Sequence, residues 1–190
     1  MGRIIVSQNV SLDGVVEDPT GEDGFKRGGW FHRIGDADRE AWAEVELAEA
    51  LRAEALLMGR RSDEYFGTRW TERTGPWADR LNSLPKYVVS STLVEPRWTN
   101  VTVLGGDVVT EVTRLKQRLQ GEIVLYASRR LVHTLMAHDL VDELRLIVYP
   151  VVLGCGERLF GETSEPKAVR LLAARTVGAG LAYLSYEVVR

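Results

Sequence analysis

Short apolar runs alternate along this chain with longer amphipathic stretches, which is the pattern of strands alternating with helices. The apolar runs predict strands over residues 4–10, 55–58, 86–91, 101–104, 122–127 and 144–150. The amphipathic stretches predict helices over residues 36–52, 62–66, 108–119 and 128–138. Residues 169–177 and 181–189, joined by Gly178-Ala179-Gly180, predict a closing antiparallel hairpin.

Two of the expected helices have identifiable starts and apolar faces. Asp36 or Asp38 is a suitable N-cap for the first, and Asp107 for the third. The apolar side of the first helix is expected to comprise Trp42, Val45, Leu47, Ala48 and Leu51. That of the third is expected to comprise Val108, Val112, Leu115 and Leu119. Residues 13–29 and 68–85 are expected to be loops, the second with a helical turn over 77–84.

This order of elements predicts a single α/β domain over residues 1–190. We expect a three-layer α/β/α arrangement, with a mixed, mainly parallel sheet that ends in the antiparallel hairpin. Ligands of such sheets bind beyond the carboxyl ends of the strands. The segments after Met58, Ser91 and Ala127 are therefore the first places to look for a site.

Composition narrows the classes of function. The 190 residues include 24 Lys and Arg and 27 Asp and Glu, giving a net charge of −3, which argues against general nucleic-acid binding. No apolar run is long enough to span a membrane, and no signal peptide pattern is present. The single cysteine, Cys155, suits a reducing, cytoplasmic setting. His32, His133 and His138 show no metal-ligand spacing, so we expect no metal.

The segment Met58-Gly59-Arg60-Arg61-Ser62 follows a strand and opens a helix. Gly59 permits close backbone approach, and Ser62 with the first-turn amides can hold an anion. Arg60 and Arg61 add charge-assisted bonds suited to a phosphate. The competing interpretation is an ordinary turn with two solvated arginines.

Two further strand ends carry polar groups. Ser90, Ser91 and Thr92 supply hydroxyls for a phosphate or ribose, or else satisfy loop backbone. Ser128 is a natural N-cap, followed by Arg129 and Arg130, whose charges oppose the helix dipole unless an anion binds there. A plain capped helix with exposed arginines is the alternative.

Near the N-terminus, Asp13-Gly14 ends the first strand. Asp13 is a candidate for contacting substrate, and turn formation alone also explains an aspartate before a glycine. Trp30 follows Gly28-Gly29 and is suited either to stacking on a flat ring or to anchoring the core.

Together these segments resemble the dihydrofolate reductase-like superfamily, and most closely its branch similar to the C-terminal reductase domain of RibD. The resemblance covers nearly the whole chain and rests on four segments in order. They are residues 6–15 with Ser11-Leu12-Asp13-Gly14-Val15, residues 57–62, residues 84–93, and residues 141–160 with Leu153-Gly154-Cys155-Gly156-Glu157.

The resemblance implies an NADPH-binding reductase fold and a set of site residues. At the 2′-phosphate and pyrophosphate side it implies Gly59, Arg60, Arg61 and Ser62, and near the adenosine Ser90, Ser91 and Thr92. Against the pyrophosphate it implies Ala127, Ser128, Arg129, Arg130 and Leu131. Asp13 and Gly14 would lie by the nicotinamide, with Asp13 orienting the substrate or supplying a proton, and Trp30 would border the pocket. A homodimer is expected by the same resemblance.

The implied activity is hydride transfer from NADPH to a C=N or C=O group of a small heterocyclic or phosphoribosyl-type substrate. A 5-amino-6-(5-phosphoribosylamino)uracil reductase, as in riboflavin biosynthesis, is the nearest model. A folate or pterin reductase, with Asp36 or Asp38 as its acidic group, is an alternative. A non-catalytic nucleotide- or metabolite-binding homodimer is another, because alanine stands at position 127, where the family usually has glycine.

Overall fold

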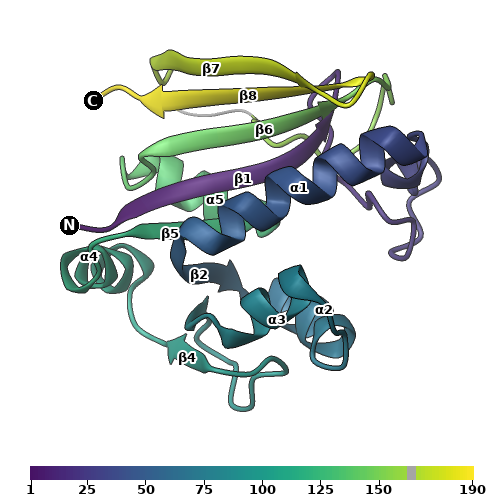
Figure 1. Cartoon of the computed structure of the whole chain (residues 1–190). Helices are drawn as coiled ribbons and strands as arrows, with labels where there is room; N and C mark the ends of the chain where they lie inside the picture. Colours follow the sequence, from purple (N-terminus) through teal and green to yellow (C-terminus); the bar gives the residue numbers. More distant parts are fainter. Residues whose placement is uncertain (162–165) are drawn as a thin grey trace. The chain divides into compact units, whose positions relative to one another are not determined.

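The computed structural model describes residues 1–161 and 166–190 (Figure 1). Within them, eight strands form one sheet in the order β4-β3-β2-β5-β1-β6-β8-β7. The strands are β1 (Arg3–Ser11), β2 (Ala53–Gly59), β3 (Lys86–Val89), β4 (Val101–Leu104), β5 (Glu122–Tyr126), β6 (Glu143–Tyr149), β7 (Val169–Val177) and β8 (Leu181–Val188). The helices are the short 3-10 helix η1 (Trp30–His32), then α1 (Asp36–Arg52), α2 (Arg60–Trp70), α3 (Pro76–Ser83), α4 (Val108–Arg118) and α5 (Arg129–Ala137).

The chain divides into two compact units. The first comprises Met1–Val6 and Val45–Asp142, and the second comprises Ser7–Glu44 and Glu143–Arg190. Each unit draws on segments far apart in the sequence, and each contains one of the polar networks considered below.

In the first unit the strands β5, β2, β3 and β4 pair in parallel. The register sets Gly59 beside Val89, and Val89 beside Leu104, so the carboxyl ends of β2, β3 and β4 lie level. Apolar side chains fill the core of this unit, among them Ile5, Leu56, Met58, Leu81, Val88 and Val124. This buried packing fixes the strand ends relative to one another.

In the second unit β8 pairs antiparallel with both β6 and β7 (Figure 1). The turn between β7 and β8 is held by Asp38, whose carboxylate accepts the N–H groups of Ala179 at 2.6 Å and Gly180 at 3.1 Å. Asp38 therefore supports the hairpin, a role that its position near a helix start did not suggest.

The predicted fold class is confirmed: the sheet is mixed and mainly parallel, and ends in an antiparallel hairpin. Asp107 also caps α4 as expected, accepting the N–H of Thr110 at 2.9 Å. Two expectations for residues 60–85 were wrong in extent. The helix predicted over 62–66 begins at Arg60 and runs to Trp70, so it enters the expected loop 68–85. The helical turn expected over 77–84 in that loop is present as the full helix α3, one residue earlier. Gly75-Pro76 is a helix-start signal, because proline at the first helical position loses no hydrogen bond.

The apolar face predicted for α1 was also wrong in part. Leu51 is 61% exposed and Ala48 is exposed, whereas Glu46 and Glu49 are buried. Desolvation, together with the neighbouring negative charge of Glu49, raises the pKa of Glu46 well above its usual value. Burial of this carboxyl therefore favours its neutral form, which costs less to bury than its charge.

Candidate functional site

Turns from four parallel strands meet at the carboxyl edge of the first unit. Gly59 ends β2, Ser90 follows β3, Gly105 follows β4, and Ala127 follows β5. The N–H of Ser90 donates to the carbonyl of Leu104 at 3.1 Å, so the pairing of β3 and β4 extends to this edge. The expectation that Gly59 and Ser90 share one rim of the sheet agrees with this geometry.

Ser128 connects two of these turns. Its Oγ accepts the N–H of Gly59 at 3.0 Å and lies 2.7 Å from Oγ of Ser62. Ser128 occupies the N-cap position of α5, yet its side chain makes no hydrogen bond within that helix. The structure thus brings Gly59, Ser62 and Ser128 together, although more than 60 residues separate the first two from the third.

The space beside Gly59 is open. A Cβ atom added there would meet only Oγ of Ser128, at 3.9 Å, among atoms within 4 Å. The backbone of Gly59 has φ −91° and ψ 167°, which any residue adopts. Since neither packing nor conformation requires glycine, the missing side chain leaves a cradle that a ligand's polar group can approach.

The backbone after β5 is unusual. Ala127 has φ 50° and Ser128 has φ 55°, both in the left-handed region that favours glycine. A left-handed residue followed by a helical one turns successive N–H groups toward a common point, an arrangement that binds anions. The step from Ser128 to Arg129, where α5 begins, has this form, and the left-handed φ carries some conformational cost for Ala127.

The other residues expected around the cofactor differ in their exposure and in their contacts. Arg60 forms an ion pair with Glu64 at 2.9 Å, whereas Arg61 and Arg130 are exposed. Leu131 is buried, so only its backbone is accessible to a ligand. The hydroxyl of Ser90 accepts the N–H groups of Thr92 and Leu93 at 3.2 and 3.1 Å.

The Ser90 contacts match the alternative interpretation of that segment, since the hydroxyl satisfies the backbone of its own loop. Ser91 and Thr92 are exposed, and Arg129 is partly exposed at the start of α5.

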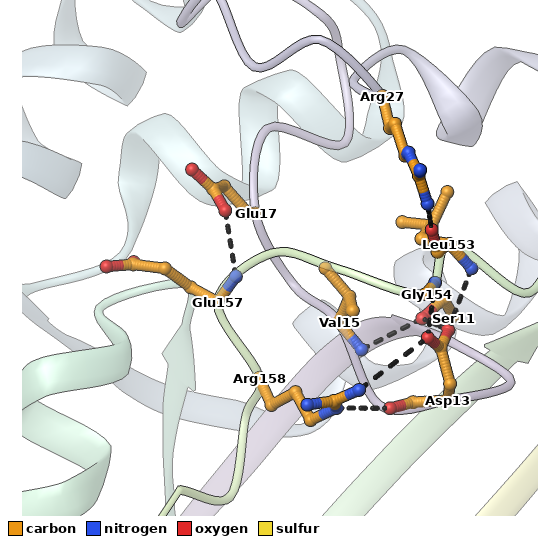
Figure 2. Close-up of polar contacts among 9 residues, drawn as sticks. All are labelled: Ser11, Asp13, Val15, Glu17, Arg27, Leu153, Gly154, Glu157 and Arg158. Atoms are coloured by element: carbon orange, nitrogen blue, oxygen red, sulfur yellow. Dashed lines mark hydrogen bonds and ion pairs between the residues drawn. The ribbon is translucent and has the colours of Figure 1, made fainter.

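In the second unit, Asp13 organises a loop network (Figure 2). Its carboxylate accepts the N–H of Leu153 at 3.0 Å, the N–H of Gly154 at 2.8 Å and the hydroxyl of Ser11 at 2.7 Å. Arg158 donates from Nε to the carbonyl of Asp13 at 3.0 Å. These contacts join the end of β1 to the segment after β6.

The same contacts fix the charge of Asp13. The N–H of Leu153 is the largest influence; the Ser11 hydroxyl and the Gly154 N–H act with it, and desolvation opposes them. Together they lower the pKa of Asp13 from 3.8 to about 2. Asp13 is therefore ionised at neutral pH, and supplying a proton from its own carboxyl is disfavoured.

Three residues in this network were not singled out from the sequence. Arg27 donates to the carbonyl of Leu153, and Glu17 accepts the N–H of Glu157 at 2.8 Å. The third, Arg158, forms an isolated β-bridge with Val15 as well as contacting Asp13. Because most of their partners are backbone groups, no residue pattern in the sequence marks these contacts.

Two further expected site residues lie in the second unit. Gly14 has φ 82°, its N–H donates to the carbonyl of Ser11 at 2.9 Å, and no atom lies within 4 Å of an added Cβ. Trp30 is 1% exposed; its Nε1 donates to the carbonyl of Glu17, and its ring packs edge-on against Tyr149, 5.2 Å between centroids. This placement agrees with a core anchor, and leaves little of the ring for stacking on a ligand.

The described residues contain neither a metal-binding cluster nor a membrane-spanning helix. Across residues 1–161 and 166–190, no group of three or more His, Cys, Asp or Glu side chains is arranged to hold a metal ion. In the same part of the chain, no helix has the length and apolar character needed to cross a membrane.

Comparison with known proteins connects both units to one family. The family model described as the RibD C-terminal domain matches residues 3–183. Among curated proteins, the uncharacterized protein YyaP of Bacillus subtilis (strain 168) is 29% identical over 191 residues, covering 97% of this chain and 94% of YyaP.

Solved structures of low sequence identity share the fold. A putative riboflavin biosynthesis protein from Shewanella sp. PV-4 has a TM-score of 0.78 at 24% identity, covering 99% of both chains. The Thermotoga maritima deaminase/5-amino-6-(5-phosphoribosylamino)uracil reductase has a TM-score of 0.63 at 13% identity, covering 99% of this chain and 57% of that one. Dihydrofolate reductase from Enterococcus faecalis, complexed with NADP(H), has a TM-score of 0.56 at 15% identity, with coverages of 99% and 97%.

Proposed function

Because this chain belongs to the RibD C-terminal domain family, we propose that it is an NADPH-dependent reductase of a small heterocyclic or phosphoribosyl-type compound. The observation that carries the proposal is the cradle at Gly59, bordered by Ser128 and by the left-handed turn at Ala127. Glycine is not needed there for folding, so its absent side chain is best explained by a ligand that approaches the backbone.

The donors around this cradle fit a phosphorylated dinucleotide. The turns at Gly59 and Ala127 each lead into a helix, α2 or α5, whose first amides and positive dipole end favour phosphate oxygens. Arg61 and Arg130 are exposed cations at these starts, suited to phosphate groups. When bound, NADPH supplies the hydride; the protein residues bind and orient it.

The reductase named for the Thermotoga maritima neighbour supports a pyrimidine substrate with a C=N or C=O group. The NADP(H) named for the dihydrofolate reductase neighbour supports the cofactor. Asp13 has the role of an ionised group that orders the 153–154 segment and accepts hydrogen bonds from a substrate. A different group, acting through water, would supply the proton to the substrate.

A pyrimidine substrate is favoured over a folate. The folate alternative requires a free acidic group near the start of α1, and Asp38 already accepts the N–H groups of Ala179 and Gly180. Asp36 is exposed and stays as the candidate for that role. Replacing Asp36 with Asn tests it, because a folate reductase would lose turnover of dihydrofolate.

The deciding experiment is a fluorescence titration of the purified protein with NADPH and NADH. We expect saturable binding with a preference for NADPH that falls in Arg61→Ala by about tenfold, the value of one charge-assisted contact. Arg114→Ala, which removes an exposed arginine of α4, is the matched control and keeps wild-type affinity. Absence of saturable binding would favour the non-catalytic alternative.

Turnover then separates the substrate classes. Consumption of NADPH is followed with a 5-amino-6-(5-phosphoribosylamino)uracil substrate and with dihydrofolate. We expect the first to be reduced. Reduction of dihydrofolate alone would contradict the substrate assignment and leave the cofactor assignment intact.

We also propose a cytoplasmic homodimer. Strand β7 supports the dimer, because it lies at the end of the strand order and exposes Val169, Leu171 and Leu172 by 43 to 53%. Exposed apolar groups on an edge strand are a common site of pairing between chains. Light scattering of the wild type and of Leu171→Lys tests the dimer, and a monomeric wild type would refute the dimer.

A further inference from the structure

Resting on the proposed function, we infer that Ser128 is a positioning residue that ties the β2–α2 turn to the β5–α5 turn and holds them ready for cofactor phosphate. A serine at an N-cap usually accepts an N–H group two or three residues ahead in its own helix. In α5 the side chain of Ser128 makes no such bond. The hydroxyl is directed instead to Gly59, 69 residues earlier in the chain.

The hydroxyls of Ser62 and Ser128 together keep one proton for a further acceptor. Oγ of Ser128 accepts from Gly59, and Oγ of Ser62 lies 2.7 Å away, where either oxygen can be the donor. Two hydroxyls bring two protons, and the bond between them uses one. In either direction of that bond, one hydroxyl proton remains for a further acceptor. Ser62 is only 7% exposed, whereas Ser128 is partly exposed at the edge of the sheet.

This arrangement makes Gly59, Ser62 and Ser128 one linked group. The N–H of Gly59 is already used by the protein, so a phosphate would be met by the spare hydroxyl proton and by the amides that follow. Because Ser128 already holds the two turns together in the free protein, the ligand does not have to order them. The entropy lost on binding is therefore smaller. Loss of the Ser128 hydroxyl breaks both contacts, whereas loss of the Ser62 hydroxyl breaks only the contact between the two serines.

The substitution Ser128→Ala is a clean test because alanine keeps the Cβ atom. Ser128 has φ 55°, a conformation strained to a similar degree for serine and alanine. The change thus removes the hydroxyl and leaves the backbone preference nearly unaltered. Ser83→Ala is the matched control, since the Ser83 hydroxyl is exposed and donates to the carbonyl of Arg80 at the end of α3.

The first measurement uses the cofactor-free protein and reads the contact directly. Amide hydrogen exchange of Gly59, followed by NMR, should be about three- to tenfold faster in Ser128→Ala than in the wild type, the weight of one hydrogen bond. The Gly59 N–H signal should also shift upfield. Ser83→Ala should show neither change. An unaltered Gly59 signal and exchange rate in Ser128→Ala would overturn the inference.

The second measurement is a double-mutant cycle for NADPH binding with Ser62→Ala, Ser128→Ala and the double variant. Each single change should weaken NADPH binding by about three- to tenfold. The double variant should bind NADPH almost as well as whichever single variant binds it less tightly, because both changes disrupt the same group. Multiplicative losses, or wild-type affinity in Ser128→Ala, would overturn the positioning role. A wild type that binds no NADPH refutes the proposed function, a result distinct from either of these.

Discussion

The carboxylate of Asp13 accepts the backbone N–H of Leu153 across 140 residues of sequence, at 3.0 Å. One carboxylate therefore fixes the path of the segment after β6, through the N–H groups of Leu153 and Gly154 (Figure 2). Arg27 binds the other side of the same residue, donating to the Leu153 carbonyl.

Asp13→Asn should destabilise the protein at neutral pH by about 1 to 2 kcal/mol, because hydrogen bonds to an ionised acceptor are replaced by weaker ones. Folding lowers the pKa of Asp13 from 3.8 to about 2. The stability that the Asp13 carboxylate contributes is therefore fully present above pH 3.8 and is lost as the pH falls through about 2. Urea unfolding of both proteins from neutral pH to about pH 2 should show their difference disappearing at the acidic end. A difference that stays constant with pH would exclude a role for the charge.

Lys116→Met should cost about 3 kcal/mol or more of unfolding free energy. Lys116 has a side-chain exposure of 3%, forms an ion pair with Asp142 and donates to the carbonyl of Leu140 at 2.9 Å. Removing Lys116 leaves the largely buried carboxylate of Asp142 with the N–H of Ile4 as a donor but without its cation. Arg114→Ala removes the exposed pair with Glu111 and should cost less than about 0.5 kcal/mol. Equal losses in the two variants, measured by urea unfolding, would contradict this account.

Gly59→Ala should separate folding from binding. The conformation of Gly59 is open to alanine and the nearest atom to the new Cβ lies 3.9 Å away, so thermal stability should be unchanged or slightly raised. NADPH affinity should fall by about tenfold or more, because the methyl group fills the space used by the ligand. Gly35→Ala, at a glycine with no atom within 4 Å of the added Cβ, is the control that keeps affinity. Undiminished binding by Gly59→Ala would remove the basis of the proposed site.

Ala127→Gly should raise both stability and NADPH affinity. Glycine adopts the φ of 50° without the strain that an L-residue carries, a gain of up to about 1 kcal/mol after the entropy of the unfolded chain is included. Calorimetry and the NADPH titration check the two effects. The matched variant Ala137→Gly, at the last residue of α5, should instead lower stability slightly, because glycine is the poorer helix former. A destabilised Ala127→Gly protein would show that alanine is favoured there.

Local patterns predicted much of the fold. Strand β4 and strand β7 have the bounds that their apolar patterns indicated, and Asp107 caps its helix, because both features depend on neighbours in sequence. The α1 face was mispredicted since burial there follows tertiary packing, which encloses Glu46 and leaves Leu51 exposed. Helix α3 was expected only as a helical turn over 77–84 within a loop, because its polar and aromatic composition obscured the start signal at Gly75-Pro76.

The sequence likewise predicted one part of the candidate site and not another. The turns after β2, β3 and β5 were found because parallel strands end at one edge, a rule of topology. The pairing of Ser128 with Gly59 and of Asp38 with Ala179 was not found. Each joins a side chain to a backbone N–H far along the chain, and backbone donors are the same at every residue except proline.

Cys155 is the single cysteine of the chain, and its thiol is exposed one residue beyond Gly154, which Asp13 holds. A maleimide dye would therefore attach at one position only, without the need to remove other thiols. Such a labelled protein reports by fluorescence on the 153–156 segment, and so gives an optical signal for any compound that rearranges the loop around Asp13.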